Sequence, residues 1–401
     1  MTHPSSSFST IRLKPKSNAR AIRHGAPWVY DNELVMDRRT KSIPAGSIAR
    51  LEDEERRFLA LVAVNPNSRI VARVLDRDPD AVIDQTWFEA RLSVALAHRE
   101  TMFDQPFYRL VHAEADGLPG VVIDRFGDTA VVQPNAAWAD VMIEPLCAAL
   151  AKVAGLRTVV MNGTGRARSL EGLEEKTDIL MGSVDAAIPV LMNGATYMAD
   201  IMGGQKTGLF YDQRPNQAFT QRLVNGKRVL DVFSHVGGFA LASLASGAAQ
   251  AVSVDSSASA LALAEQGADA MGASDRFVTR KGDAFDVMAA LREEGELFDV
   301  VICDPPAFAP SKNTVEKGLR AYERVARMAA PLVKEGGYLG LCSCSHAADL
   351  DTFRGACNRG IGRAARSAQL IHTGFAGADH PLMPQLAESG YLKALFYRLM
   401  P

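Results

Sequence analysis

Short apolar runs alternate with helical stretches from about Val229 onward in the 401-residue sequence. This alternation is typical of a parallel β-sheet with helices on both faces, because parallel strands are joined through a crossover helix. We therefore predict an α/β fold for this part of the chain. Seven runs are candidate strands: Arg228–Phe233, Ala251–Asp255, Arg276–Arg280, Phe298–Cys303, Gly337–Cys342, Ala368–His372 and Tyr391–Leu399.

Two polar motifs directly follow two of these runs. Asp304-Pro305-Pro306 comes after one run, and Ser343-Cys344-Ser345 comes after the next. The carboxyl ends of parallel strands form the ligand crevice of an open α/β sheet. The sequence therefore places a carboxylate and a thiol on the same edge. An acid and a nucleophile facing one pocket suit covalent chemistry on a heteroaromatic base.

Composition limits the class of protein. Hydrophobic residues make up 47% of the sequence and charged residues 22%, which is typical of a globular protein, and the length suggests two or three domains. The formal net charge of −2 argues against a uniformly basic nucleic-acid coat but not against a local basic patch. The five cysteines show neither a disulfide framework nor paired Cys-x-x-Cys spacing, so we expect no metal and a reducing cytoplasm. Met1–Thr10 is polar and predicts neither a signal peptide nor a membrane span.

The N-terminal part reads as a small β-rich module, which we place at residues 1–80. Turn residues such as Pro44-Ala45-Gly46 separate its β-prone runs. The runs are Trp28–Tyr30, Ser47–Leu51, Phe58–Val64 and Ile70–Leu75.

Basic residues gather at the start of this module, close in sequence to Trp28 and Tyr30. A solvated charged face is one interpretation of such a cluster. Clustered basic residues beside aromatic residues in a compact β module favour contact with RNA. We therefore predict RNA contacts for Lys14, Lys16, Arg20, Arg23 and Trp28.

The pattern of helical and β-prone stretches over residues 81–190 predicts a small α+β middle domain. The pattern is helical from about Thr86 to Phe103 and again from about Ala137 to Val153. A segment rich in Gly, Thr and Arg, Asn162–Glu175, reads as irregular. The candidate strands are Tyr108–Ala113, Val121–Asp124, Ala130–Gln133 and Thr158–Met161.

The stretch Val229–Ala240 has the pattern strand, glycine turn, helix. Gly237 and Gly238 let the backbone approach a ligand at a helix N-terminus. Asp255 ends the second strand, where a carboxylate can bind ribose hydroxyls. After the third strand, Asp283 can accept from an adenine amino group, and Phe285 can cover the ring. A nicotinamide dinucleotide is the alternative ligand, but the full Gly-x-Gly-x-x-Gly motif is absent.

Acidic residues after three successive strands, followed by Asp-Pro-Pro after the fourth, favour S-adenosylmethionine as the cofactor. Seven strands with a final antiparallel pair are what a Rossmann-like class I methyltransferase sheet needs. The predicted cofactor-binding residues in this domain are Asp231, Phe233, Ser234, Gly237, Gly238, Asp255, Ser256, Asp283, Ala284, Asp304 and Pro305.

Cys344 and Asp304 fit the two roles that methylation of cytosine C5 requires. C5 becomes nucleophilic when a thiolate adds to C6, and a carboxyl group at the N3/N4 edge stabilises the adduct. The alternative for any buried cysteine is a small hydrophobic residue. That interpretation suits Cys147, Cys303 and Cys357, whereas Cys342 is undecided.

The Asp-Pro-Pro motif also occurs in enzymes that methylate amino groups. These enzymes place Tyr or Phe directly after the prolines, where the ring stacks on a flipped base. Here Ala307 intervenes and Phe308 comes one residue later, which disfavours amino methylation. We predict that Phe308 contacts RNA.

The chain resembles the bacterial large-subunit ribosomal RNA (23S) cytosine-C5 methyltransferase family, which joins an N-terminal PUA domain to a class I methyltransferase. The resemblance implies a PUA-like β-barrel, a middle domain, and a methyltransferase domain over residues 191–401 with a hairpin at 195–214. It also implies that Asp212 and Arg214 help close the cofactor site, although a hairpin ion pair is equally compatible with the sequence. The matching stretches are Pro27–Tyr30, Ala113–Gly120, Lys206–Arg214, Phe233–Ala240, Asp304–Lys312, Ser343–Ser345 and Ala378–Pro381.

Two departures from the family pattern are visible. Ala26 replaces the histidine of the usual His-Pro-Trp, and Ala307 stands where other cytosine-C5 enzymes keep a cysteine that helps release the product. A relative of this fold that methylates guanine N7 lacks the Ser-Cys-Ser thiol, so Cys344 separates the two chemistries.

The resemblance implies C5 methylation of a cytidine in 23S ribosomal RNA, naked or in a large-subunit precursor. The alternatives are guanine-N7 or amino-group methylation, and an RNA-binding factor that binds S-adenosylmethionine without turnover. We expect no membrane partner, and the sequence leaves a homodimer open.

Overall fold

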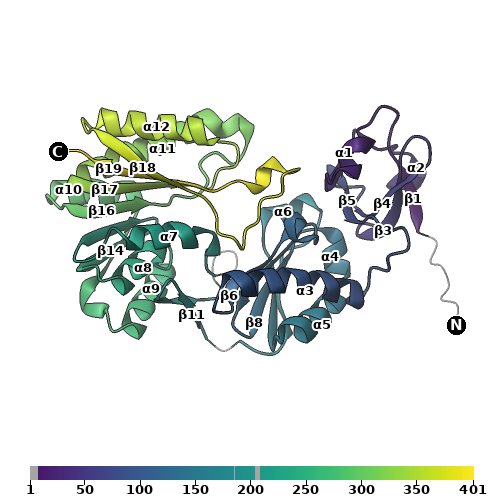
Figure 1. Cartoon of the computed structure of the whole chain (residues 1–401), viewed down its shortest axis with the longest axis horizontal. Helices are drawn as coiled ribbons and strands as arrows, with labels where there is room; N and C mark the ends of the chain where they lie inside the picture. The colour runs from purple at the N-terminus through teal and green to yellow at the C-terminus, as the bar shows by residue number, and fades with distance from the viewer. Residues whose placement is uncertain (1–7, 185, 204–207) are drawn as a thin grey trace. The chain divides into compact units, whose positions relative to one another are not determined.

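The structure is a computed structural model that describes residues 8–184, 186–203 and 208–401 (Figure 1). Contacts within the chain define two compact units. The first comprises Met1–Asp185 with Pro381–Ala387, and the second comprises Ala186–His380 with Glu388–Pro401. The finer division at residues 80 and 190 stays a prediction.

The first unit begins with a five-stranded sheet in the order β1-β3-β4-β5-β2. The four β-prone runs of the sequence form strands β2 to β5, as expected, and the short strand β1 pairs in parallel with β3. Apolar side chains from all five strands form the core of this module. The elements are β1 (Ser9–Arg12), α1 (Ala19–Arg23), β2 (Trp28–Tyr30), α2 (Arg38–Lys41), β3 (Ser47–Glu52), β4 (Phe58–Val64) and β5 (Ile70–Asp76).

A second five-stranded sheet follows, in the order β10-β9-β8-β7-β6. Helices α3 and α5 contact each other, and their apolar faces share one core with the sheet. The predicted second helix is interrupted at Met142 and forms two helices, α4 and α5. The elements are α3 (Gln85–Met102), β6 (Phe107–His112), η1 (Ala113–Asp116), β7 (Val121–Phe126), β8 (Thr129–Pro134), α4 (Ala137–Val141), α5 (Ile143–Ala154) and β9 (Thr158–Gly163).

The segment 162–175, which the sequence predicts to be irregular, contains a short helix, α6 (Arg166–Leu170). A strand that the sequence analysis missed, β10 (Lys176–Met181), follows and pairs antiparallel with β9. Arg168 of α6 is buried, and its guanidinium donates to the carbonyl of Pro134 and to the carboxylate of Asp140, 3.0 and 2.7 Å away. These tertiary hydrogen bonds organise the segment, so local composition did not reveal it.

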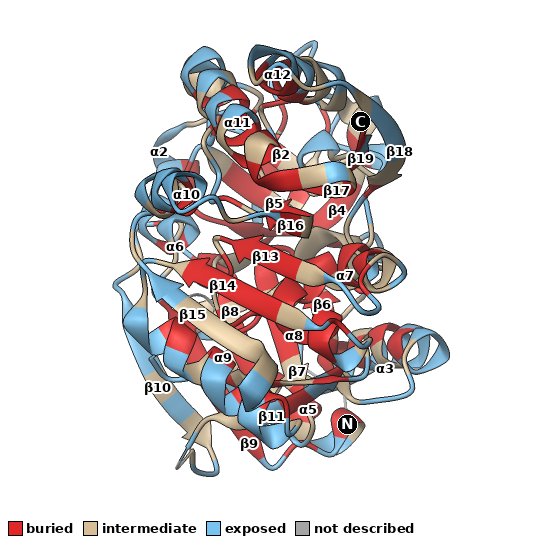
Figure 2. Ribbon diagram, turned by 90° about the vertical axis from the view of Figure 1, so that its left-hand side faces the viewer, coloured by how far each residue is buried: buried red, intermediate tan, exposed pale blue. Residues whose placement is uncertain are grey.

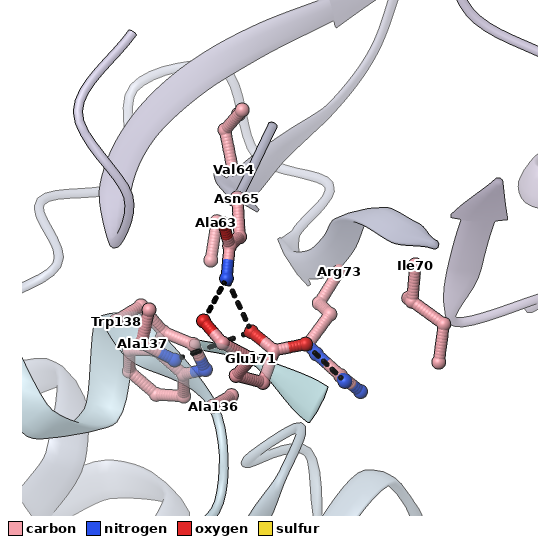
Figure 3. Close-up of a pocket in the computed structure, with 9 residues that line it drawn as sticks. All are labelled: Ala63, Val64, Asn65, Ile70, Arg73, Ala136, Ala137, Trp138 and Glu171. Carbon is pink, nitrogen blue, oxygen red and sulfur yellow. Dashed lines mark hydrogen bonds and ion pairs between the residues drawn. The ribbon is translucent and has the colours of Figure 1, made fainter. Parts of the chain in front are cut away.

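Glu171, at the end of α6, joins the two sheets of the first unit (Figure 3). Its carboxylate is buried and accepts hydrogen bonds from Ser68 Oγ at 2.8 Å, Arg73 Nη2 at 3.0 Å and Asn65 Nδ2 at 3.0 Å. Both carboxylate oxygens therefore have partners. We call Asn65, Ser68, Arg73 and Glu171 the junction cluster.

The second unit contains the seven-stranded sheet that the sequence predicts, in the order β15-β14-β13-β16-β17-β19-β18. Strands β13 to β17 pair in parallel, and β19 pairs antiparallel with both β17 and β18, which confirms the final antiparallel pair. The central strands are buried (Figure 2). The strands are β13 (Arg228–Val232), β14 (Gln250–Asp255), β15 (Phe277–Lys281), β16 (Phe298–Cys303), β17 (Val333–Ser343), β18 (Ala368–Gly374) and β19 (Lys393–Leu399).

Helices cover both faces of this sheet (Figure 1). Helices α7 to α9 lie on one face, and α10 to α12 lie on the other, with α11 and α12 packed against each other. The helices are α7 (Arg214–Gln221), α8 (Gly238–Ala245), α9 (Ala258–Ala270), α10 (Ala284–Glu293), α11 (Val315–Ala329) and α12 (Leu350–Arg363). None of the helices within the described ranges has the length and apolarity that crossing a membrane requires.

The hairpin of the second unit lies earlier than the predicted 195–214. It consists of β11 (Ile188–Met192) and β12 (Ala195–Ala199), and β12 contacts α8 and α9. Asp212 lies in a 3₁₀ turn, η2 (Tyr211–Gln213), and Arg214 begins α7. Pro215 in the first turn fixes a helical φ there, which favours a helix start over a strand. Lys206 and Thr207 of the quoted Lys206–Arg214 stretch lie outside the described residues.

Candidate active site

The turn between β13 and α8 has an unusual backbone. Phe233 and His235 have positive φ angles of 64° and 50°, and Gly237 has a φ of 79°. A Cβ on Gly237 would lie 3.1 Å from Leu241 Cγ and 3.2 Å from Ala264 Cβ. Gly237 is therefore required both by its backbone conformation and by the close approach of α8 and α9. Non-glycine residues in the left-handed region cluster at functional sites.

Asp231 is fully buried at the end of β13, and its two carboxylate oxygens differ. Oδ2 accepts from the amides of Phe239 and Ala240, at 3.0 and 2.9 Å, which holds the first turn of α8. Oδ1 has no hydrogen-bond partner among the described residues, and neither does the buried hydroxyl of Ser234. Burial raises the pKa of Asp231 to about 7, although the two amides oppose the shift. Buried polar atoms without partners are rare in proteins, so this cluster indicates a ligand-binding position.

Asp255 ends strand β14 and Asp283 follows strand β15, as predicted. Asp255 accepts from the amides of His235 and Ser257, each at 2.8 Å, so its carboxylate is held beside the glycine turn. Asp283 caps α10 through the amide of Phe285 at 2.9 Å. Ser256 is exposed directly after β14, and Ala284 is buried at the start of α10.

Asp304 and Cys344 lie on the same edge of the sheet, which confirms the predicted placement. Their strands pair in register, with Cys303 opposite Leu341. The Cys344 thiol lies 4.0 Å from the carbonyl oxygen of Pro305, the residue directly after Asp304. The loops after β16 and β17 therefore bring the thiol to the Asp-Pro-Pro motif.

The other four thiols have environments that suit packing. Cys303, Cys342 and Cys357 are buried, and burial raises the pKa of each well above its usual value. Cys147 is partly exposed on α5, and burial raises its pKa to about 11. The hydrophobic interpretation of Cys147, Cys303 and Cys357 is consistent with these positions. Cys342 has the same character.

Tyr322 of α11 holds the Ser-Cys-Ser motif, a role that the sequence analysis missed. Ser343 Oγ donates to the Tyr322 hydroxyl at 2.9 Å, and Ser345 Oγ lies 2.7 Å from the same hydroxyl. Ser345 Oγ also accepts from the amide of Ala309 at 2.9 Å, in the loop that follows Asp-Pro-Pro. The two serines thus turn inward onto one phenol while Cys344 faces Pro305.

Asp212 and Arg214 lie near the same end of the unit but are not parts of a hairpin. Asp212 Oδ2 accepts from the Tyr391 hydroxyl at 2.6 Å, and Asp212 Oδ1 has no hydrogen-bond partner within the described ranges. Burial lowers the pKa of Arg214, and the carboxylate of Asp379 opposes this shift. The Arg214 guanidinium lies 5.6 Å from the ring centroid of Tyr211.

The predicted RNA-contacting residues fall into two groups. Lys14, Lys16, Arg20 and Arg23 are all exposed, and Arg23 forms an ion pair with the buried Asp53. An open pocket of about 220 Å³ is lined by Lys14, Arg20 and Arg23 together with acidic residues including Asp53.

The two aromatic residues predicted to contact RNA, Trp28 and Phe308, also interact with other side chains of the protein. The Trp28 indole donates to Glu114 at 2.8 Å, next to the junction cluster. Phe308 packs against Tyr322, with ring centroids 5.0 Å apart. Within residues 8–184, 186–203 and 208–401, no group of three or more His, Cys, Asp or Glu side chains could hold a metal ion.

The fold and this edge define a Rossmann-like α/β protein in which a glycine turn with buried, unpartnered polar atoms shares the sheet edge with a thiol and a carboxylate. Comparison with known proteins gives the family. Residues 143–398 match the S-adenosylmethionine-dependent methyltransferase family, and residues 11–77 match the PUA-like domain. The chain belongs to the S-adenosylmethionine-dependent methyltransferase family and carries an N-terminal PUA-like domain.

Relatives that share about a third of their residues with this chain match it over nearly its whole length. "Ribosomal RNA large subunit methyltransferase I" of Klebsiella pneumoniae subsp. pneumoniae is 33% identical over 96% of this chain and 97% of its own length. The protein of the same name from Escherichia coli O139:H28 is 33% identical over 98% of this chain and 100% of its own length. A solved structure of a candidate methyltransferase complexed with SAH has a TM-score of 0.81 at 19% identity, with coverage of 98% and 100%, and it shows the same fold.

S-adenosylmethionine is therefore the cofactor of this protein. The residues at the sheet edge fit it. The glycine turn brings backbone close to the edge, and Asp231 and Ser234 each present a buried polar atom without a partner in the described chain. The predictions of fold class, cofactor and enzyme class are confirmed.

Proposed function

We propose that this protein methylates C5 of a cytidine in 23S ribosomal RNA through a covalent bond between Cys344 and C6 of the base. The observation that carries the proposal is the position of the Cys344 thiol, 4.0 Å from the Pro305 carbonyl at the Asp-Pro-Pro loop. The names of the relatives supply the substrate class, because both act on large-subunit ribosomal RNA by name.

The chemistry follows from the reactivity of cytosine. The Cys344 thiolate adds to C6, and the electron pair of the C5=C6 bond moves toward N3, where the Asp304 carboxyl group stabilises the adduct. C5 thereby becomes an enamine carbon that would take the methyl group of the bound cofactor, whose S–CH3 bond breaks with the electron pair kept by sulfur, so that a neutral thioether leaves. A base then removes the C5 proton, the C5=C6 bond forms again, and the sulfur leaves as thiolate.

The cofactor-binding roles predicted from the sequence are part of the proposal. Asp255 is held at the glycine turn by two amides, and each of its oxygens keeps a lone pair that can accept from a ribose hydroxyl. Asp283, which caps α10, is proposed to face the adenine. The remaining proposed contacts come from Phe233, Ser234, Gly237, Gly238, Ser256, Ala284, Pro305, Asp212 and Arg214.

We propose that the PUA-like module anchors the RNA and that the methyltransferase domain reads the flipped base. The exposed Lys14, Lys16 and Arg20 support this role best, whereas Arg23 is paired with Asp53 and Trp28 already donates to Glu114. Phe308 is proposed to contact the target base. A ribosomal RNA substrate implies action in the cytoplasm, and a homodimer stays open to measurement.

Nucleoside mass spectrometry on ribosomal RNA from cells that lack this protein tests the proposal. We expect the loss of a single 5-methylcytidine from 23S RNA and its return with the wild-type gene but not with Cys344→Ala. Loss of 7-methylguanosine or of an amino-methylated base would instead favour the alternative methyltransferases. Ribosomal RNA with unchanged modifications would favour the other alternative, an RNA-binding factor that binds S-adenosylmethionine without turnover.

A further inference from the structure

Lys393 is a buried lysine in the strand next to the Ser-Cys-Ser motif. It begins β19, its exposed fraction is 4%, and in the antiparallel register it lies opposite Ser343 of β17. Lysine is rarely buried unless its ammonium has partners, because removing the charge from water is unfavourable. Most of the residues that follow it in β19 are buried and apolar. The burial of Lys393 therefore requires a specific role.

The hydrogen bonds of Lys393 point to the loop that carries Cys344. Its Nζ donates to the carbonyl of Ser345 at 2.7 Å and to the carbonyl of Ala348 at 2.6 Å. These carbonyls begin and end a turn closed by the amide of Ala348, which donates to Ser345 O at 3.3 Å. The ammonium thus fixes the turn directly after the thiol from its buried side.

Lys393 also brings a positive charge to the thiol. The acidic groups that act on its ammonium are Cys344 and Asp349, and they oppose the lowering of its pKa by burial. Groups from other elements also lie around the thiol, among them the phenol of Tyr322 on α11, the Pro305 carbonyl after β16 and the carboxylate of Asp304 directly before Pro305. The neutral phenol, the carbonyl dipole and the Asp304 carboxylate do not favour a thiolate, whereas the ammonium of Lys393 does.

We propose that Lys393 is a positioning residue for Cys344, which fixes the turn behind the thiol and stabilises the thiolate that attacks the base. The inference rests on the proposed covalent function. It explains why the serines on either side of Cys344 bond to neutral groups, while the charge is supplied separately from β19.

The test separates the charge of Lys393 from its hydrogen bonds. Lys393→Gln keeps an amide that can donate to both carbonyls but carries no charge, and Lys393→Arg keeps the charge. The rate at which iodoacetamide alkylates Cys344 in the full-length protein is measured from about pH 6 to about pH 10. Mass spectrometry of the peptide that contains Cys344 detects the modification. In Lys393→Gln we expect the alkylation midpoint to move about one pH unit or more upward, because the thiolate loses an opposite charge. Lys393→Arg should keep the midpoint close to that of the wild type.

Methyl transfer supplies the second readout. Lys393→Gln should be about tenfold slower than the wild type at neutral pH and should recover as the pH rises, because one pH unit changes the thiolate fraction about tenfold. A structural role alone would slow the reaction by the same factor at every pH and would leave the alkylation midpoint unchanged. Either of these results would overturn the proposal.

Three controls keep the result interpretable. Lys334→Met removes a lysine at the other end of β17, where its Nζ pairs with Asp299 at 3.1 Å, and should leave the midpoint unchanged. If Lys393→Gln does not fold, Lys393→Met replaces it, since its apolar chain of similar length suits the buried site. If Cys344→Ala methylates RNA normally, the proposed function fails. If Cys344→Ala is inactive while the midpoint of Lys393→Gln is unchanged, only the role of Lys393 fails.

Discussion

Two buried carboxylates of this protein, Glu171 and Asp231, have opposite surroundings. Each oxygen of Glu171 accepts hydrogen bonds from the junction cluster. Asp231 has two amides on one oxygen and no partner on the other in the described chain. Complete pairing is what a structural carboxylate needs, whereas an unmatched oxygen beside a glycine turn is what a ligand site leaves open. The junction should therefore govern stability and the sheet edge should govern binding and turnover.

The largest expected effect is at the sheet edge. Cys344→Ala should abolish methyl transfer, with less than a few per cent of wild-type turnover left (about a hundredfold loss), because C5 is then never activated. Calorimetry should still detect S-adenosylmethionine binding. Cys147→Ala is the matched control, because Cys147 is also partly exposed, and it should keep full activity. Turnover by Cys344→Ala above that level would rule out the covalent mechanism.

The burial of the Asp231 carboxylate should make stability depend on pH. Its pKa is about 7 in the folded protein, well above that of an aspartate in an unfolded chain, about 4. The folded state therefore holds the proton more tightly, and stability falls as the pH rises from about 4 to about 7. Asp231→Asn removes this dependence, so its stability relative to the wild type should rise by up to about 4 kcal/mol over that window. Chemical denaturation at about pH 5 and about pH 8 measures the free energy of unfolding of both proteins. The same change with pH in the wild type and in Asp231→Asn would contradict the prediction.

The junction cluster should respond in stability alone. Glu171→Ala leaves Arg73 without one of its two carboxylate partners, and the first unit should lose about 3 kcal/mol. Hydrogen exchange of the amides in β4 and β5 detects the loss in the full-length protein. S-adenosylmethionine affinity should not change. Weaker S-adenosylmethionine binding by Glu171→Ala would contradict the assignment of Glu171 to stability and Asp231 to ligand binding.

Asp255 tests the ligand side of the comparison. Asp255→Ala should weaken S-adenosylmethionine binding by about 1.5–3 kcal/mol, the usual value of a charge-assisted hydrogen bond. Titration calorimetry measures the affinity, with Asp299→Ala, on the same sheet in an ion pair with Lys334, as a control that should bind normally. Unchanged affinity in Asp255→Ala would mean that another residue binds the ribose.

The smallest expected effect concerns RNA binding, where a basic residue in an ion pair is compared with one that has none. Arg20 makes no ion pair within the described residues, whereas Arg23 is paired with Asp53. Arg20→Ala should weaken RNA binding and make its salt dependence shallower by about one contact, because fewer counterions are released. Arg23→Ala should change the slope less, and cofactor affinity should stay constant in both. If the salt dependence of RNA binding is the same for Arg20→Ala and the wild type, the basic cluster of the N-terminal module is only a solvated charged face.

The strands of the second unit could be predicted because short apolar runs alternate with helical stretches, and polar motifs follow β16 and β17 directly. That alone placed Asp304 and Cys344 on one edge. Helix α6 could not be predicted, because tertiary hydrogen bonds hold Arg168. The predicted hairpin at 195–214 ran too far along the chain, because Pro215 favours the start of α7 there. Tyr322 and Lys393 come from elements distant in sequence from Cys344. The one signal for Lys393 was a lysine at the start of an otherwise apolar run.

Strand β19 is made after β18 but lies between β17 and β18 in the sheet. During translation the Cys344 loop is therefore synthesised before the strand that supplies Lys393. The sheet cannot close until residues 393–399 have left the exit tunnel and inserted beside β17. A nascent chain thus has its nucleophile before it has the ammonium behind that nucleophile. Assembly of the reactive loop is postponed until the final strand is in place.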